Sequence, residues 1–287
     1  MRSMLVPVAA AWLTAGADLD CAAADRAAMI TDLEGAVELT TTGAAREAEI
    51  LDDLGSDATL AVGSGARVTL VYPGSGREYD ITGRARLAVG SEQPRMLEGA
   101  APAVRDLALP RATGLQTTGR GSVAETTVRM RSVARAPSLQ LIAPAGTVLV
   151  PPGEFSWEAP PGMNGFEFDL SEAGGDSLFT AHVDGTRLEL PAAVRLRAGA
   201  DYRWRVRART ASGRPALDKA RFRIADDLLR REVERARERA GSSVSARVVL
   251  AAWLENEGLE AEARTIWRAL AAERPAAAAL RARAGQP

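Results

Sequence analysis

The sequence has few of the side chains that most often carry catalysis and metal binding. Its 287 residues include one cysteine, Cys21, and one histidine, His182. A single cysteine excludes an intramolecular disulfide and a cysteine-cluster metal site, and His182 has no second histidine to complete a zinc site. Because His182 alternates with the apolar Ala181 and Val183, we expect it to face solvent. We therefore predict no catalytic residue, no cofactor and no bound metal.

The sequence also has almost no net charge. It balances 36 Lys and Arg against 37 Asp and Glu, and Lys219 is its only lysine. Such a chain has no overall field to attract nucleic acid or an anionic membrane. The acidic pairs at 52–53 and 226–227 do not indicate catalysis, because neighbours diverge along a strand and acids often cap helices. We predict a protein that is not an enzyme and has no nucleic-acid partner.

Long apolar runs are absent except near the start of the chain. Residues 4–17 are almost wholly apolar, but at about 1.5 Å per residue they are too short to span a hydrocarbon core of ~30 Å. Arg2 precedes them, and residues 15–17 and 22–24 both fit the A-x-A cleavage pattern. We predict a signal peptide over residues 1–24, cleaved after Ala17 or Ala24. The mature protein would then be periplasmic or secreted, with no membrane span.

Residues 29–98 consist of short stretches in which apolar side chains alternate with polar ones. This period of two predicts an antiparallel sheet. Gly-Ser-Gly sequences at 63–65 and 74–76 predict hairpin turns between strands. The stretches are GAVEL at 35–39, TLAVG at 59–63, ARVTLVY at 66–72, REYDITG at 77–83 and RLAVG at 86–90.

Part of this segment resembles the FecR-like domain of bacterial envelope proteins. The resemblance lies in Gly35-x-Val37, residues 51–60, and the stretches GSGARVTLVY and GREYDITG. It implies a small, β-rich extracytoplasmic module. FecR-type regulators of sigma factors carry a cytoplasmic segment and a membrane span before this domain. Here a predicted signal peptide stands in their place. This difference argues against direct control of a sigma factor.

Residues 99–136 are rich in Ala, Pro, Gly, Thr and Arg, which predicts a linker, with one candidate strand at 126–132. Residues 137–225 return to the period of two. In the stretch YRWRVRAR at 202–209, Tyr202 and Trp204 share one face of a strand, and Arg203 and Arg205 share the other. We expect the aromatic face to be buried and the arginine face to pair with acids on the adjacent strand. An anion site on the arginine face is the alternative.

This second segment resembles a fibronectin type III-like or immunoglobulin-like sandwich. The pattern L-x-x-G-x-x-Y-x-W-x-V-x-A is similar to the penultimate strand of such a sandwich with its tyrosine corner. Leu196, Gly199 and Tyr202 would take the corner positions, and Trp157 would be the core tryptophan of an early strand. The predicted fold is therefore multidomain and mainly β, with a small FecR-like β-domain, this β-sandwich and a C-terminal α-helical hairpin.

Residues 226–287 have helical periodicity. A first helix should begin with the acids at 226–227 and end at Gly241. The stretch at 243–275 then resembles a single tetratricopeptide (TPR)-like repeat, with Gly258 at its turn. A lone unit cannot bury both of its faces, so it must pack on the preceding helix, on the sandwich or on a partner. We predict Leu254, Trp267 and Leu270 as partner-binding residues.

Together these features predict a non-enzymatic interaction or scaffold protein of the cell envelope, with a signalling role there as one form of this function. The expected partner is a protein, and the sequence sets no oligomeric state. The alternative is a module that binds glycan or peptidoglycan. Glycan binders display exposed aromatic side chains, whereas nearly every aromatic here falls on an apolar, alternating face.

Overall fold

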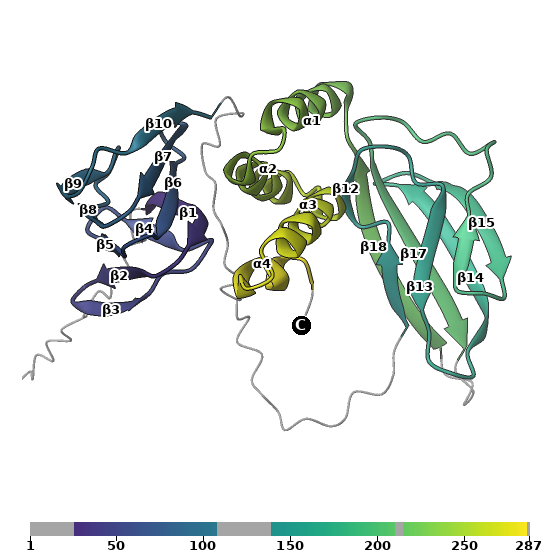
Figure 1. Ribbon diagram of the computed structural model, residues 1–287. Helices are drawn as coiled ribbons and strands as arrows, with labels where there is room; N and C mark the ends of the chain where they lie inside the picture. The colour runs from purple at the N-terminus through teal and green to yellow at the C-terminus, as the bar shows by residue number, and fades with distance from the viewer. Residues whose placement is uncertain (1–25, 108–138, 210–214, 286–287) are drawn as a thin grey trace, which may run out of the picture.

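A computed structural model describes residues 26–107, 139–209 and 215–285 (Figure 1). The described chain is mainly β, with four helices at its C-terminal end. Buried apolar side chains form three clusters, one in each of two β-domains and one centred on the helices. The predicted signal peptide at 1–24 and the candidate strand at 126–132 lie outside the described residues.

The N-terminal β-domain has two five-stranded sheets that share one core, which includes Ile30, Leu39 and Tyr79. One sheet has the order β10-β7-β6-β1-β4. Its strands are β1 (Arg26–Glu34), β4 (Asp53–Gly55), β6 (Arg67–Tyr72), β7 (Arg77–Thr82) and β10 (Ala103–Asp106). The other has the order β3-β2-β5-β8-β9. Its strands are β2 (Val37–Thr41), β3 (Ala44–Glu47), β5 (Thr59–Val62), β8 (Ala85–Ala88) and β9 (Arg95–Glu98).

The alternating stretches of the sequence form strands β2, β5, β6, β7 and β8, but three expectations for this region were wrong. The Gly-Ser-Gly turn at 63–65 is not a hairpin, because β5 and β6 belong to different sheets. The domain includes residues 26–28, ahead of the expected start at residue 29, because β1 pairs with both β4 and β6. It also continues into the expected linker, where β10 pairs with β7.

The second β-domain is a sandwich of a three-stranded and a five-stranded sheet. The smaller has the order β11-β13-β16, with β11 (Gln140–Ala143), β13 (Glu154–Glu158) and β16 (Arg187–Glu189). The larger has the order β12-β18-β17-β14-β15. Its strands are β12 (Gly146–Val148), β14 (Asn164–Glu172), β15 (Ser177–Val183), β17 (Asp201–Arg209) and β18 (Pro215–Ile224).

Strand β17 has the predicted two faces. Tyr202 and Trp204 are buried, whereas Arg203 and Arg205 are exposed. The Trp204 ring lies 5.2 Å from Phe155 of the facing sheet, edge to face. The predicted tyrosine corner is present, because the backbone N–H of Arg197 donates a 2.7 Å hydrogen bond to the Tyr202 hydroxyl.

The helices are α1 (Asp227–Ala240), α2 (Val244–Asn256), α3 (Glu260–Glu273) and α4 (Ala278–Arg283). As predicted, the acids at 226–227 begin α1, where the Asp226 carboxylate accepts a 2.8 Å hydrogen bond from Leu229 N–H, and Gly241 ends it. The sequence did not reveal α4. Helix α2 is buried almost all round, which requires neighbours on several sides.

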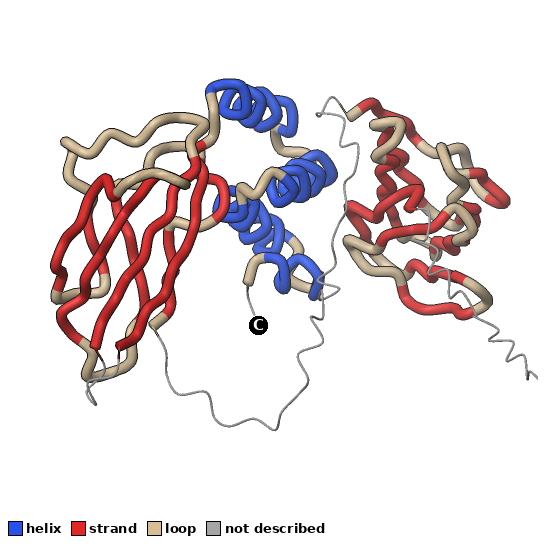
Figure 2. Tube along the Cα trace, turned by 180° about the vertical axis from the view of Figure 1, so that it is seen from behind, coloured by secondary structure: helices blue, strands red, loops and turns tan. Residues whose placement is uncertain are grey.

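Those neighbours come from the whole chain. The helices follow the sandwich in sequence, yet they lie between the two β-domains (Figure 1), and the view from behind shows the same order (Figure 2). Helix α2 contacts α1, α3 and strand β1, while α3 contacts β12 of the sandwich. The C-terminal helices therefore join the two β-domains, which are separated in sequence by residues 108–138.

Candidate functional site

The junction between the N-terminal β-domain and the helices gathers the buried polar groups of the described chain. One face of the sheet containing β1 covers the core of its own domain. The other contributes Met29 and Val71 to the apolar cluster of the helices. All the buried polar or charged residues of the described chain belong to β1, β6, β7 or α2: Thr31, Asp32, Thr69, Glu78 and Ser245.

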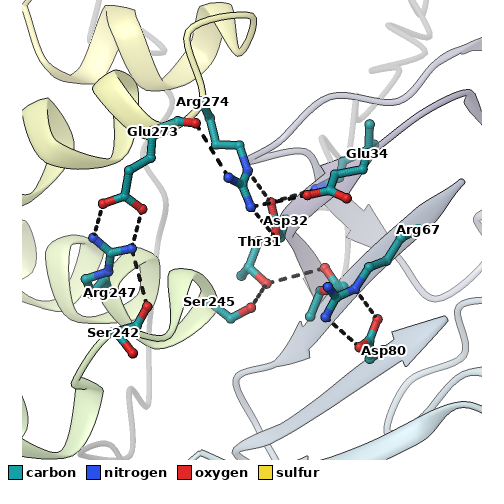
Figure 3. A network of polar contacts seen from close by, with 12 residues as sticks. Thr31, Asp32, Glu34, Arg67, Asp80, Ser242, Ser245, Arg247, Glu273 and Arg274 are labelled. Atoms are coloured by element: carbon teal, nitrogen blue, oxygen red, sulfur yellow. Dashed lines mark hydrogen bonds and ion pairs between the residues drawn. The ribbon is translucent and has the colours of Figure 1, made fainter. Parts of the chain in front are cut away.

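A β-bulge in β1 aims two successive side chains at the helices. The register of β1 against β6 shifts between Ile30 and Asp32, which leaves Thr31 as an extra residue. The Thr31 hydroxyl donates to the Ser245 hydroxyl of α2 at 2.9 Å, and it also lies 3.3 Å from the Thr69 carbonyl oxygen. These contacts are drawn in Figure 3. A regular strand would point Thr31 and Asp32 to opposite faces.

The second polar contact is an ion pair at the end of α3. Arg274 donates hydrogen bonds of 3.0 and 3.1 Å to the two carboxylate oxygens of Asp32, and Glu34 lies 3.4 Å from the same guanidinium. The Asp32 side chain is only 10% exposed. Figure 3 shows Arg274 reaching from the helices to β1. Two parallel N–H···O bonds fix the orientation of both partners, so this pair sets the position of α3 on the sheet.

A neighbouring pair holds the end of α3 to α2. Arg247 donates hydrogen bonds of 2.7 and 2.6 Å to Glu273, the residue before Arg274. The Arg247 hydrogen bonds hold the pKa of Glu273 below its usual value. The carboxylate is therefore charged near neutral pH. Because Glu273 is held to α2 by Arg247, the backbone of the next residue, Arg274, is also held in place.

Glu78 is a buried carboxyl of the junction, and its pKa is raised. Burial raises this pKa, while Arg105, 3.6 Å away, and the Ser245 hydroxyl oppose the rise. Glu78 is 4% exposed, so its charged form has lost most of its water. The Ser245 hydroxyl thus interacts with Thr31 and Glu78, on two different strands.

A cleft opens beside this network. Its volume is about 480 Å³, and its walls come from the β1–β2 turn, the segment after β3, and the turn between α3 and α4. Apolar groups make up much of the lining: Leu33, Ala48, Ile50, Pro275 and Ala276–Ala279. The remaining lining residues are Gly35, Glu47, Glu49, Glu273 and Arg274. The ion pair of Arg274 with Asp32 therefore fixes the separation of the two walls.

The three residues that the sequence assigned to partner binding are inside the protein. Leu254 and Leu270 are 0% exposed and Trp267 is 1% exposed. They pack within the cluster of the helices, and the Trp267 indole N–H donates a 2.9 Å hydrogen bond to Glu255. As partner-binding residues these three were wrong, because the neighbours that the hairpin needs are α1, α4 and both β-domains of the same chain.

The helices also contact the sandwich closely. The backbone N–H and the hydroxyl of Thr147 in β12 donate to the carbonyls of Gly258 and Glu257, at 2.8 and 2.9 Å. A Cβ at Gly146 would lie 2.8 Å from the Gly258 carbonyl oxygen. Both glycines have a positive φ, of 67° and 75°, so this contact is built from backbone and excludes side chains.

The other candidate groups are dispersed. His182 is exposed on β15, as expected. In the part of the chain that the structure describes, no group of three or more His, Cys, Asp or Glu side chains is placed to hold a metal ion. Among the same residues, no helix combines the length and the hydropathy needed to cross a bilayer.

Sequence reasoning missed the residues of the junction. The alternation in REYDITG implies that Glu78 and Tyr79 point to opposite faces of a strand. Nothing in the pattern shows whether a helix or solvent covers the face of Glu78. Arg274 was one arginine among many, and β1 was not predicted as a strand. Its burial on both faces removes the alternation by which a half-exposed strand is recognised.

Comparisons with known proteins give no family. No family model matches the chain, and no curated protein matches it. Among solved structures, the chain is similar to CopC from Methylosinus trichosporium OB3b. The sequence identity is 15%, the match covers 31% of this chain and 95% of that chain, and the TM-score is 0.26. Likeness at this level assigns neither a ligand nor a function to this chain.

Proposed function

We propose that this chain is a non-enzymatic interaction or scaffold protein of the bacterial cell envelope, which binds a protein partner in the cleft between the N-terminal β-domain and the turn from α3 to α4. In this proposal the N-terminal β-domain is a FecR-like module. The sandwich is of the fibronectin type III or immunoglobulin kind, and α2 and α3 form a TPR-like hairpin. The tyrosine corner at Tyr202 supports this assignment of the sandwich.

The cleft is the observation that carries the proposal. Both of its walls are fixed by the ion pairs of Arg274 and Arg247, so an open apolar surface is held ready without rearrangement. Preorganised surfaces bind more tightly because less ordering is needed on association. Glu47 and Glu49 are exposed at the rim, and the nearby Arg46 is engaged by Asp52. The expected partner segment therefore has apolar side chains flanked by basic ones.

The positions of the aromatic side chains favour a protein partner over a glycan. Glycan binders stack sugar rings on exposed aromatics. No tryptophan, tyrosine or phenylalanine among residues 26–107, 139–209 and 215–285 is exposed. Phe179 of β15 is half-buried and the others are buried.

The test is capture from an envelope extract by the mature chain, with retained proteins identified by mass spectrometry. The double variant Glu47→Arg, Glu49→Arg reverses the charge of the rim. A partner held in the cleft should be lost from this variant. The matched control is Asp184→Arg, Glu189→Arg, which makes the same change of charge with two exposed acids of the sandwich. The control should retain the partner as the unmodified chain does.

Two outcomes would overturn the proposal. The first is equal capture by the rim variant, which would put the binding surface elsewhere. The second is sedimentation of the unmodified chain with purified peptidoglycan and no captured protein, which is the result that the glycan-binding alternative expects.

Export is tested separately. N-terminal sequencing of the protein from a cell-envelope fraction should begin at Asp18 or Asp25, after one of the two A-x-A sites. An intact Met1 on protein in the cytoplasmic fraction would contradict the envelope location.

A further inference from the structure

The outer face of the larger sandwich sheet places like charges directly opposite each other. In the antiparallel pair of β17 and β18, Arg203 lies opposite Arg221, and Arg205 lies opposite Lys219. All four side chains are exposed. Directly opposed residues on one face have Cβ atoms about 4.5–5.5 Å apart, and like charges at this separation destabilise a sheet. Two successive pairs of this kind make a compact block of four cations.

Carboxylates surround this block but do not neutralise it. Arg205 pairs with Asp169 at 3.2 Å, as the sequence predicted for this face. Arg203 instead lies opposite Ser171 on β14. In the portion of the chain that is described, Arg203, Arg221 and Lys219 form no ion pair with any carboxylate. Among the described residues, Arg205 is thus the one paired cation of the block, and Arg203, Arg221 and Lys219 form an unpaired centre.

The unpaired arginines border a depression in the surface. Its volume is about 400 Å³, and Arg203, Arg221 and Arg223 line it together with Asp201. Gly146, Ala173, Tyr202 and Phe222 complete its lining. Arg223 is engaged by Asp201 at 3.6 Å, so the free hydrogen-bond donors at this depression belong to Arg203 and Arg221.

The chemistry of these donors selects the ligand. Each guanidinium offers a planar fork that matches two oxygens of one anion. A phosphate ester group has three terminal oxygens and up to two negative charges, so it can bridge two arginines beside a lysine. A carboxylate has two oxygens and one charge and would leave part of the block unpaired.

We propose that Arg203 and Arg221, with Lys219 beside them, bind the phosphate group of a small soluble ligand on the outer face of the sandwich. A small ligand fits better than a membrane or a nucleic acid, because Glu167, Asp169 and Asp201 lie on the same face and would repel an extended anionic surface. This site is far from the cleft in sequence and does not depend on the proposed function.

The test is isothermal titration of the full mature chain with inorganic phosphate and with pyrophosphate, at constant ionic strength set by chloride. We expect binding with a Kd of about 1 mM or tighter. The double variant Arg203→Gln, Arg221→Gln should lose at least about tenfold in affinity. The matched control is Arg207→Gln, on the same strand and face, because Arg207 is paired with Glu167. It should bind within about twofold of the unmodified chain.

Thermal unfolding separates loss of the site from loss of the fold. Removing two like charges relieves repulsion, so the double variant without ligand should melt no lower than the unmodified chain. Phosphate should raise the melting temperature of the unmodified chain and of the control, but not that of the double variant. Absence of phosphate binding, or an equal loss in Arg207→Gln, would overturn the site. So would stronger binding to phosphatidylglycerol vesicles or single-stranded DNA that depends on the same two arginines.

Discussion

Arg274 and Asp32 are joined by two hydrogen bonds, of 3.0 and 3.1 Å, across 242 residues of sequence. This pair and the contact between Thr31 and Ser245 connect the last helices to the first strand. The C-terminal helices therefore pack against the N-terminal β-domain, and on their other side they contact β12 of the sandwich. If these contacts hold the helices to the β-domain, removing them should lower the free energy of unfolding.

Loss of the Arg274 side chain should weaken the junction. Because Asp32 is mostly buried, Arg274→Gln leaves a carboxylate with little water and no bidentate partner. We expect the free energy of unfolding to fall by about 1.5–3 kcal/mol, measured by urea denaturation. The control is Arg46→Gln, which breaks a bidentate pair with Asp52 on the exposed surface of the same domain and should cost less than about 1 kcal/mol. Equal losses in the two variants would contradict a special role for the junction pair.

Glu78 should make the junction less stable as the pH rises. Burial raises its pKa, so the folded protein holds this proton to higher pH than the unfolded chain does. The resulting stabilisation is complete below the unfolded pKa of 4.5 and is lost as the pH rises through the folded pKa. Glu78→Gln keeps a neutral side chain of similar shape at every pH.

Urea denaturation of both proteins from about pH 4 to about pH 7 checks this sign. The two free energies of unfolding should be similar at the acidic end, and Glu78→Gln should be the more stable protein near neutral pH. If the variant were the less stable one near neutral pH, the attraction of Arg105 to Glu78 would outweigh the cost of burial.

Gly146 should not tolerate a side chain, because the backbone of the α2–α3 turn occupies the space. Gly146→Ala combines a positive φ of 67° with a Cβ 2.8 Å from a carbonyl oxygen. Gly165 has the same φ, but a Cβ there would have nothing within 4 Å, so Gly165→Ala isolates the conformational cost of about 1–2 kcal/mol. We expect Gly146→Ala to lose about 1–3 kcal/mol more than this control in thermal or urea unfolding. Equal losses would mean that the helices do not rest on β12.

The two faces of β17 should respond differently to truncation. Trp204 is 0% exposed and its indole N–H donates to the Pro144 carbonyl at 2.9 Å, so Trp204→Ala should cost about 3–5 kcal/mol. Arg205→Ala removes an exposed pair with Asp169 and should cost less than about 1 kcal/mol. Denaturant unfolding of both variants compares them, and a costlier arginine change would contradict the facing of the strand.

The sequence by itself determined the elements whose pattern is local. The alternation at 202–208 fixed which side chains of β17 are buried, because one face of that strand meets the core and the other meets water. The acids at 226–227 and Gly241 fixed the ends of α1, because capping depends on a few neighbouring residues. The pairing of Arg205 with an acid on the next strand was also predictable from the same alternation.

Only the tertiary structure decided what lies between the β-domains. Strand β1 has a continuous buried run and a bulge at Thr31, so it lacks the period of two that marks a strand with one wet face. Leu254, Trp267 and Leu270 have an apolar character that is the same whether a partner or the rest of the chain covers them. Asp32 and Arg274 have no local signal at all, because a contact across 242 residues depends on how the helices dock and on no property of either segment alone.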